Sequence, residues 1–355
     1  MKKIKYINFT SSNRSLDDAK NIYKQRVNDA LEVFSKFGSN FDNRDCPVCG
    51  SNNNSEIDNF HETYGIVKCN RCASVFVNPC PNLDALEYYY NNCKCNQMLG
   101  EVYRDRSFSN NTIISDRTLD VIEIIKDLYE SSESKKTIKV LEVGCSSGVF
   151  LAELKLGLAQ NGLLENCELQ GVDIDKSSVE KSVDADLKLI AMPVEKFSEY
   201  NNCEFDLVIH FELIEHLSDP YKFMVAVNDL LKPSGVHYFH TPNLLGFDNT
   251  ALSWNSTRLL AHGIFPPMHI NAFTTQNITY FALRANFNVV SIDTPGKLDV
   301  DIVKLVKNEL SNDSPFKFIN EFTDDQLAII QSWLQILNAS SHMRVTLKKI
   351  VPLLL

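Results

Sequence analysis

The chain has 355 residues and a formal net charge of −10, which counts against a general nucleic-acid binder because such a protein needs a basic surface. Hydrophobic residues make up 44% and charged residues 23%, a balance typical of a globular protein with a sizeable core. No window approaches the ~18 continuous apolar residues of a membrane span. Polar residues follow the N-terminal lysines where a signal peptide would turn apolar, so we expect a cytoplasmic protein.

The N-terminal part is predicted to form small elements that precede a larger domain. Apolar residues recur at helical spacing over 16–37, up to Gly38, and again over 112–130. Between them lies a stretch rich in Cys, Asn and Pro. We divide the chain into an N-terminal helical segment (1–43), a small Cys-rich module (44–82), a helical connection (83–136) and a large domain (137–355) with a helical insertion (298–340).

Strands and helices alternate in the large domain, which predicts an α/β fold. The expected strands cover 138–143, 169–173, 187–190, 205–210, 235–240, 287–292 and 343–348. Alternation of this kind favours a sheet that is covered by helices on both faces. We therefore predict a doubly wound, mostly parallel, seven-stranded Rossmann-like sheet.

Two Cys-x-x-Cys pairs occur nineteen residues apart, Cys46 with Cys49 and Cys69 with Cys72. This is close to the spacing expected of a tetrathiolate zinc site. Four thiolates leave no vacant position on Zn²⁺, so the site is expected to be structural. Unrelated free thiols are the alternative.

A glycine turn follows the first strand of the large domain. Gly144 and Gly148 frame it, Glu142 precedes it, and Asp173 ends the next strand. Ligands bind at the carboxyl ends of strands in such sheets, and a carboxylate at the second position can accept both hydroxyls of a ribose. Asp175 is the alternative ribose partner, and an ordinary turn residue is the alternative interpretation of Asp173.

Four blocks of the chain resemble class I S-adenosylmethionine-dependent methyltransferases. They are Glu142–Gly148, Gly171–Asp173, Phe205–Leu217 and Gly235–Asn243, and they occur in the order of the family's motifs. The resemblance covers about residues 112–295. It implies a methyltransferase fold and S-adenosylmethionine as cofactor.

Further segments resemble a bacterial subgroup with an N-terminal zinc ribbon. They are Cys46–Cys72 with the following Val75–Pro79, then Pro267–Thr274 and Leu298–Val303. Members of this subgroup are often associated with the modification of surface-polysaccharide or natural-product sugars. The resemblance therefore implies a sugar-linked acceptor and a zinc ribbon that shapes the acceptor pocket.

The family resemblance assigns roles around the cofactor. Glu142 would orient the turn, and the turn itself would contact the methionine part through Gly144, Cys145 and Gly148. Asp173 would hold the ribose. Ile174 would pack against the adenine, whose ring and amino group would be held by Met192, Pro193, Val194 and Glu195. His210 and Phe211 would lie below the sulfonium. Ordinary core packing is an equally good interpretation of Val194 and Phe211.

An alcohol acceptor needs a general base, for which His is the usual choice near neutral pH. The candidates are His216, His240 and His269. His216 follows Glu215 just after the fourth strand, and we interpret this pair mainly as structural. His240 ends the fifth strand and His269 lies in a Pro-rich loop. His237 is expected on the opposite face of its strand.

The leading hypothesis is thus a methyltransferase acting on a sugar, glycan or nucleotide-sugar acceptor. The alternatives are an RNA methyltransferase with a zinc-ribbon recognition module and a non-catalytic scaffold. Tyr88, Tyr89 and Tyr90 could stack on an acceptor, although an apolar seam between modules is the more ordinary role. The sequence names neither the acceptor nor the oligomeric state.

Overall fold

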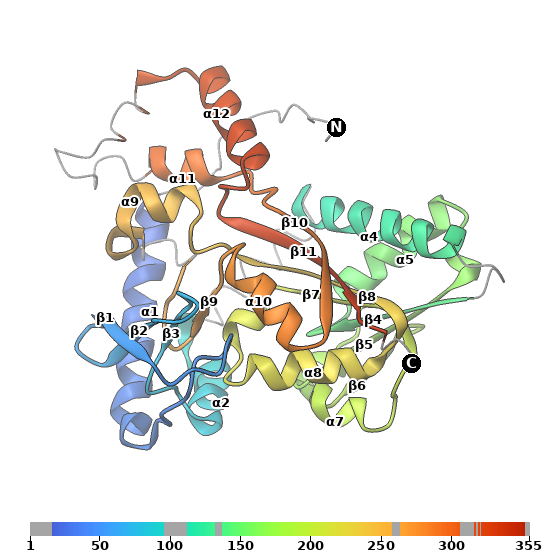
Figure 1. Ribbon diagram of the computed structural model, residues 1–355, viewed down its shortest axis with the longest axis horizontal. Helices are drawn as coiled ribbons and strands as arrows, with labels where there is room; N and C mark the ends of the chain where they lie inside the picture. Colours follow the sequence, from blue (N-terminus) through green and yellow to red (C-terminus); the bar gives the residue numbers. More distant parts are fainter. Residues whose placement is uncertain are drawn as a thin grey trace.

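The computed structural model describes residues 16–95, 112–131, 137–257, 263–305, 316, 319 and 321–351 (Figure 1). Parts of the predicted N-terminal segment, helical connection and helical insertion lie outside these residues. The helices are α1 (Leu16–Phe37), α2 (Leu83–Asn92), α4 (Thr112–Ser131), α5 (Val149–Gln160), α6 (Lys176–Val179), α7 (Val194–Ser198), α8 (Pro220–Leu230), α9 (Phe247–Thr257), α10 (Asn277–Arg284), α11 (Asp299–Leu305) and α12 (Asp324–Ile336), with the 3₁₀ turns η1 (Gly38–Asn40), η2 (Leu164–Asn166) and η3 (Ile214–His216). The strands are β1 (Asn54–Phe60), β2 (Tyr64–Cys69), β3 (Val75–Val77), β4 (Ile138–Val143), β5 (Cys167–Asp173), β6 (Lys188–Ala191), β7 (Phe205–Phe211), β8 (Leu231–Pro242), β9 (Asn271–Ala272), β10 (Phe287–Asp293) and β11 (His342–Lys349).

The main sheet has seven strands in the order β10-β11-β8-β7-β4-β5-β6, which confirms the predicted mostly parallel α/β fold. Strands β4 to β8 pair in parallel, and β11 runs antiparallel to both β8 and β10. The strand order reverses at β4, whose two neighbours are β5 and β7. In such sheets a ligand crevice forms outside the carboxyl ends of the strands at this reversal.

Side chains that alternate along the strands build an apolar layer on each face of the main sheet. On β4, Val140 belongs to the cluster formed with α4 and α5, whereas Leu141 belongs to the cluster formed with α7, α8 and α10. The helices accordingly lie on both sides of the sheet (Figure 1). This alternation decides which strand-end side chains can share one site.

Helix α6 after β5 is short and ends at Val179. The Val183 amide donates a hydrogen bond to the carbonyl of Ser147, 3.0 Å away in the glycine turn. This bond holds Val183 beside the glycine turn.

The N-terminal module, defined here as residues 16–95, carries a second sheet of order β1-β2-β3-β9. Its fourth strand, β9, comes from residues after the main sheet's strand β8. One apolar cluster joins α1, α2 and β1–β3 to residues 264–272. The module and the 264–272 segment of the large domain are therefore continuous in three dimensions, although 168 residues lie between them in the sequence.

The remaining helices α9, α11 and α12 form an apolar cluster of their own. Buried Asp299 joins them to β11, because its carboxylate accepts hydrogen bonds from Gln331 and the Ser341 amide. Among the described residues, no helix has both the length and the apolar character that crossing a membrane requires.

Candidate functional site

The turn between β4 and α5 has the backbone conformation that its glycines predict. Gly144 and Gly148 have φ values of 75° and 80°, in the left-handed region that glycine adopts without strain. A Cβ on Gly148 would lie 3.0 Å from Leu189 Cδ1, a contact tighter than most side chains make. Gly171 of β5 likewise leaves space for Cys145, whose Sγ would lie 2.6 Å from an added Cβ.

Asp173 lies at the carboxyl end of β5 and faces this turn. Its Oδ2 accepts a hydrogen bond from the Ser146 amide at 2.8 Å, and its Oδ1 accepts one from the Asp175 amide at 2.8 Å. Each oxygen keeps a further lone pair for a hydroxyl donor. Asp175 instead caps α6, because its carboxylate accepts hydrogen bonds from the Ser177 amide and the Ser178 hydroxyl.

Glu142 lies beneath the turn and is 5% exposed. Its Oε2 is buried and has no hydrogen-bond partner among the described residues. Burial raises the pKa of Glu142 to about 8, while Arg117 of α4 acts to lower it. Arg117 stacks over the Phe211 ring, with its guanidinium carbon 4.8 Å from the centroid. A buried carboxylate and a cation therefore lie together at the carboxyl edge of the sheet, and no sequence motif pointed to Arg117.

The residues assigned to the adenine differ in exposure. Ile174 is 76% exposed beside Asp173, and Pro193 is also exposed. The Met192 amide donates to the Asp173 carbonyl at 2.8 Å, which holds the ends of β5 and β6 together. Val194 is buried in the core cluster, the packing role that was its alternative interpretation.

His210 and Phe211 point to opposite faces of the sheet. His210 is fully buried and stacks on Phe239, with ring centroids 4.7 Å apart. His237 contacts the same ring, so it lies on the face away from His240, as predicted. Phe211 contacts Phe150 of α5 on the face that carries Glu142. Only Phe211 of the pair therefore lies on the Glu142 face.

Glu215, His216 and His269 form a cluster at the ends of β7 and β8. Their potential ligand atoms all lie within 4.8 Å of one another. Glu215 Oε1 is 3.8 Å from His216 Nε2, and the two imidazole ring centroids are 4.7 Å apart. A carboxylate with two imidazoles also has the donor types of a divalent-cation site. The structure thus brings two of the three histidine candidates together.

Hydrogen bonds fix the orientation of this cluster. His216 Nδ1 lies 2.9 Å from the Met268 carbonyl, which can only accept, so Nδ1 carries the proton and Nε2 a lone pair. The Thr241 hydroxyl donates to Glu215 Oε2 at 2.9 Å, whereas the buried Oε1 has no hydrogen-bond partner among the described residues. Burial raises the pKa of Glu215 to about 8, and it lowers the pKa of His216 to about 4.

Tyr90 of α2 reaches the same cluster from the N-terminal module. Its hydroxyl lies 3.1 Å from His216 Nδ1. Tyr89 is buried in the module's apolar cluster, and Tyr88 contacts Lys36 and Glu32 at its surface. The three tyrosines therefore have three different environments, which their adjacency in the sequence did not distinguish.

His240 lies apart from this cluster, in a separate hydrogen-bond network with Tyr238 and Asp120. The Tyr238 hydroxyl donates to Asp120 at 3.0 Å and lies 2.8 Å from His240 Nε2, so His240 Nε2 donates to Tyr238. Burial, followed by the charge of Arg117, holds the pKa of His240 well below its usual range. His240 is therefore a neutral, hydrogen-bonded ring.

Glu212 follows β7 and has a charged or ionisable partner on each carboxylate oxygen. Arg117 contacts its Oε1 at 2.8 Å, and His342 of β11 contacts its Oε2 at 3.3 Å. Although burial acts in the opposite direction, His342 and Arg117 together hold the pKa of Glu212 far below its usual range. Neither Glu212 nor His342 was a candidate from the sequence, because their partnership joins strands that are far apart in the chain.

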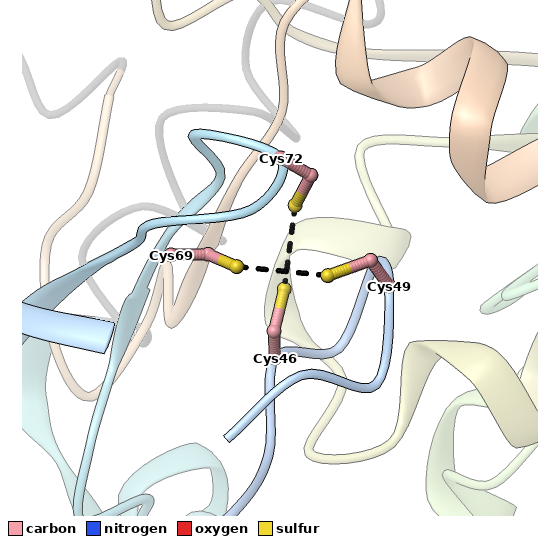
Figure 2. A group of neighbouring side chains, drawn as sticks. All are labelled: Cys46, Cys49, Cys69 and Cys72. Carbon is pink, nitrogen blue, oxygen red and sulfur yellow. Dashed lines mark hydrogen bonds between the residues drawn. The ribbon is translucent and has the colours of Figure 1, made fainter. Parts of the chain in front are cut away.

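The four predicted zinc ligands converge on one point (Figure 2). Cys46 Sγ is 3.5 Å from Cys72 Sγ, and Cys49 Sγ is 3.6 Å from Cys69 Sγ. Four sulfurs about 2.3 Å from a tetrahedral Zn²⁺ are about 3.8 Å apart, so the present residues fit a structural zinc ion. Cys80, Cys93 and Cys95 are buried outside the cluster.

The hydrogen bonds that surround the cysteine sulfurs also suit a metal at this site. The Ser74 hydroxyl lies 2.9 Å from Cys46 Sγ, and the Arg71 amide donates to Cys69 Sγ at 3.4 Å. Arg284 of α10 donates to the carbonyls of Pro47 and Val48 in the first cysteine loop. The cysteine cluster is therefore attached to a helix of the large domain.

A family model described as a methyltransferase domain matches residues 114–292, half of the chain. The chain belongs to this methyltransferase domain family. The matched residues run from α4 to β10 and include the glycine turn, Asp173, Glu215 and His269. They form an S-adenosylmethionine-dependent methyltransferase domain.

Individual relatives match part of this chain. A protein of Vibrio atlanticus named ubiquinone biosynthesis O-methyltransferase is 31% identical over 122 residues, which cover 33% of this chain and 48% of the relative. The chain thus spans about half the length of the curated relatives it matches. A solved S-adenosylmethionine-dependent methyltransferase from Archaeoglobus fulgidus is 15% identical, covers 70% of this chain and 98% of its own, and has a TM-score of 0.43.

The glycine turn of this domain fits S-adenosylmethionine in its residue chemistry. The unpaired Glu142 oxygen and the Arg117 cation suit the amino-acid end of the cofactor, which carries an ammonium and a carboxylate. Asp173 has acceptor capacity for ribose hydroxyls, and the exposed Ile174 beside it offers apolar surface to the adenine. Gly144 and Gly148 let a ligand approach the backbone.

Proposed function

We propose that this chain is a methyltransferase that uses S-adenosylmethionine to methylate a hydroxyl group, or a comparably acidic carbon, of a small acceptor. The observation that carries the proposal is the Glu215–His216–His269 cluster at the strand ends beside the glycine turn. Leu213, two residues before Glu215, lies close enough to Gly144 for an added Cβ to be 3.2 Å from its Cδ2. The proton-accepting groups are therefore adjacent in the fold to the predicted cofactor site.

S-adenosylmethionine supplies an electrophilic methyl group when it is bound. Glu142 and Arg117 would hold its amino-acid end, and Asp173 its ribose. In-line displacement also needs an aligned acceptor, and such alignment can contribute several kcal/mol to catalysis. His210 would act only through packing, because its ring lies in the core on the other face of the sheet.

The Glu215–His216 pair would accept the proton of the acceptor. His216 is the more exposed of the two, with 19% of its side chain accessible against 1% for Glu215, so the acceptor meets His216 first. The Nε2 lone pair would take the proton, and the adjacent Glu215 carboxylate would stabilise the imidazolium that forms. Since the pKa of Glu215 is raised to about 8, the proton-free pair becomes populated at mildly alkaline pH.

A sugar-linked acceptor is the finer part of this proposal and rests on the sequence resemblance of the cysteine segment and of Pro267–Thr274. Methyl transfer to oxygen agrees with the name of the curated relatives, ubiquinone biosynthesis O-methyltransferase. An RNA acceptor is the weaker alternative, because the net charge of −10 opposes phosphate binding.

The proposal is tested with a labelled methyl donor and a panel of nucleotide sugars, free sugars, phenols and RNA. We expect label transfer to a hydroxyl compound and not to RNA. On that acceptor, His216→Gln should lower turnover by about 10²–10⁴ and leave cofactor affinity unchanged. The matched control is His61→Gln, at an exposed histidine, which should change neither turnover nor cofactor affinity. Full turnover by His216→Gln would exclude His216 as the base.

A further inference from the structure

We propose that Asn271 is a positioning residue that fixes the Glu215–His216 turn and couples it to the cysteine-bearing N-terminal module. This inference rests on the proposed function insofar as it explains how that pair is held. Asn271 is 1% exposed and forms part of β9, the strand that the large domain contributes to the module's sheet.

Asn271 supports the turn through backbone groups that the turn leaves unsatisfied. Its side-chain Nδ2 donates to the Leu217 carbonyl at 2.7 Å and lies 3.3 Å from the Ile214 carbonyl and 3.4 Å from the Glu215 carbonyl. The last carbonyls of a helical turn have no partner within it, and η3 is only three residues long. The amide nitrogen of Asn271 therefore acts as an external cap.

Met268 and Ile270, which precede Asn271, also bind the Glu215–His216 turn. The Ile270 amide donates to the Glu215 carbonyl at 3.0 Å, and the Met268 carbonyl accepts from His216 Nδ1. Backbone bonds thus hold the carboxylate residue, and a side-chain bond orients the imidazole. The 268–271 segment binds the Glu215–His216 turn along its whole length.

The other edge of this segment is bonded to the N-terminal module. The Val77 amide donates to the Ile270 carbonyl at 2.9 Å, and β3 pairs with β9 through Phe76 opposite Asn271. Arg44 joins both sides, because its guanidinium donates to the carbonyls of Ile270 at 2.9 Å and Ser218 at 2.8 Å. Strand β3 and Arg44 flank the two cysteine pairs, so the folded cysteine module holds the segment that aligns His216.

The test uses the full-length, zinc-loaded protein labelled with ¹⁵N-histidine and saturated with S-adenosylhomocysteine. His216→Gln assigns the His216 ring signals. We expect Asn271→Ala to shift those signals and to speed amide hydrogen exchange at residues 214–217 at least tenfold, with zinc content unchanged and cofactor affinity within twofold. Asn228→Ala is the matched control, because Asn228 also donates its side-chain amide to a backbone carbonyl, that of Asn286.

Unchanged His216 signals and unchanged exchange in folded Asn271→Ala would overturn the inference. If Asn271→Ala does not fold, Arg44→Gln is measured instead, with the same expected shifts and the same refuting result. On an identified acceptor, Asn271→Ala should lower kcat about 10- to 100-fold with little change in the KM for S-adenosylmethionine, since small misplacements cost this much. If Asn271→Ala shifts the His216 signals but His216→Gln keeps full turnover, Asn271 retains its positioning role and His216 is rejected as the base.

Discussion

Replacing Glu215 with Gln should make the protein more stable at alkaline pH while it impairs methyl transfer. The substitution keeps the shape of the side chain. The Gln carbonyl can accept from Thr241, as Glu215 Oε2 now does, and the new amide would take the place of Oε1, which lies 3.8 Å from His216 Nε2 and has no hydrogen-bond partner among the described residues. The variant therefore removes a buried ionisable group and keeps the bond to Thr241.

The direction in which stability changes with pH follows from the direction of the Glu215 pKa shift. Burial, and then repulsion by Glu212, raises the pKa of Glu215 from 4.5 to about 8. Between these two values the folded protein keeps a proton that the unfolded chain has lost, so stability falls as pH rises. The full shift corresponds to about 5 kcal/mol, an upper limit for the loss between pH 4.5 and pH 8.

Urea unfolding at pH 5, 6, 7 and 8 measures this effect. We expect the free energy of unfolding of Glu215→Gln to rise relative to that of the wild type by at least about 1 kcal/mol per pH unit across this range. Glu165→Gln, at an exposed carboxylate, should follow the wild type at every pH. Equal pH dependence of Glu215→Gln and the wild type would refute the argument that Glu215 is a buried, proton-binding carboxyl.

Three further predictions concern the cysteine cluster, the ribose partner and the remaining histidine. Cys69→Ser should lose stoichiometric zinc and unfold the N-terminal module while the main sheet remains, as elemental analysis and circular dichroism can check; retained zinc would contradict this. Asp173→Ala should weaken S-adenosylmethionine binding by about 1.5–3 kcal/mol in calorimetry, and wild-type affinity would move the ribose site to Asp175. His240→Gln should lower the melting temperature through loss of the Tyr238 bond while retaining most turnover; a turnover loss of 10² or more with unchanged stability would make His240 the base instead.

The sequence by itself determined the local features of this protein. Alternating strands and helices predicted the sheet, because the burial of both faces imposes a periodicity that can be counted along the chain. The Cys-x-x-Cys pairs predicted the cysteine cluster, because two sulfurs on one tight turn already have the spacing of metal ligands. Gly144, Gly148 and Asp173 were also found, since a strand, a turn and a helix that follow one another directly fix their positions.

Only the tertiary structure decided which histidines lie together and what holds them. His216 meets His269 because the 263–272 segment returns to the end of β7 and continues into the sheet of the N-terminal module as β9. The roles of Arg117, Tyr90 and Asn271 depend on contacts between elements that are remote in sequence, for which a single chain gives no local signal. Burial then sets the protonation of Glu215, because the cost of removing a carboxylate from water depends on everything packed around it.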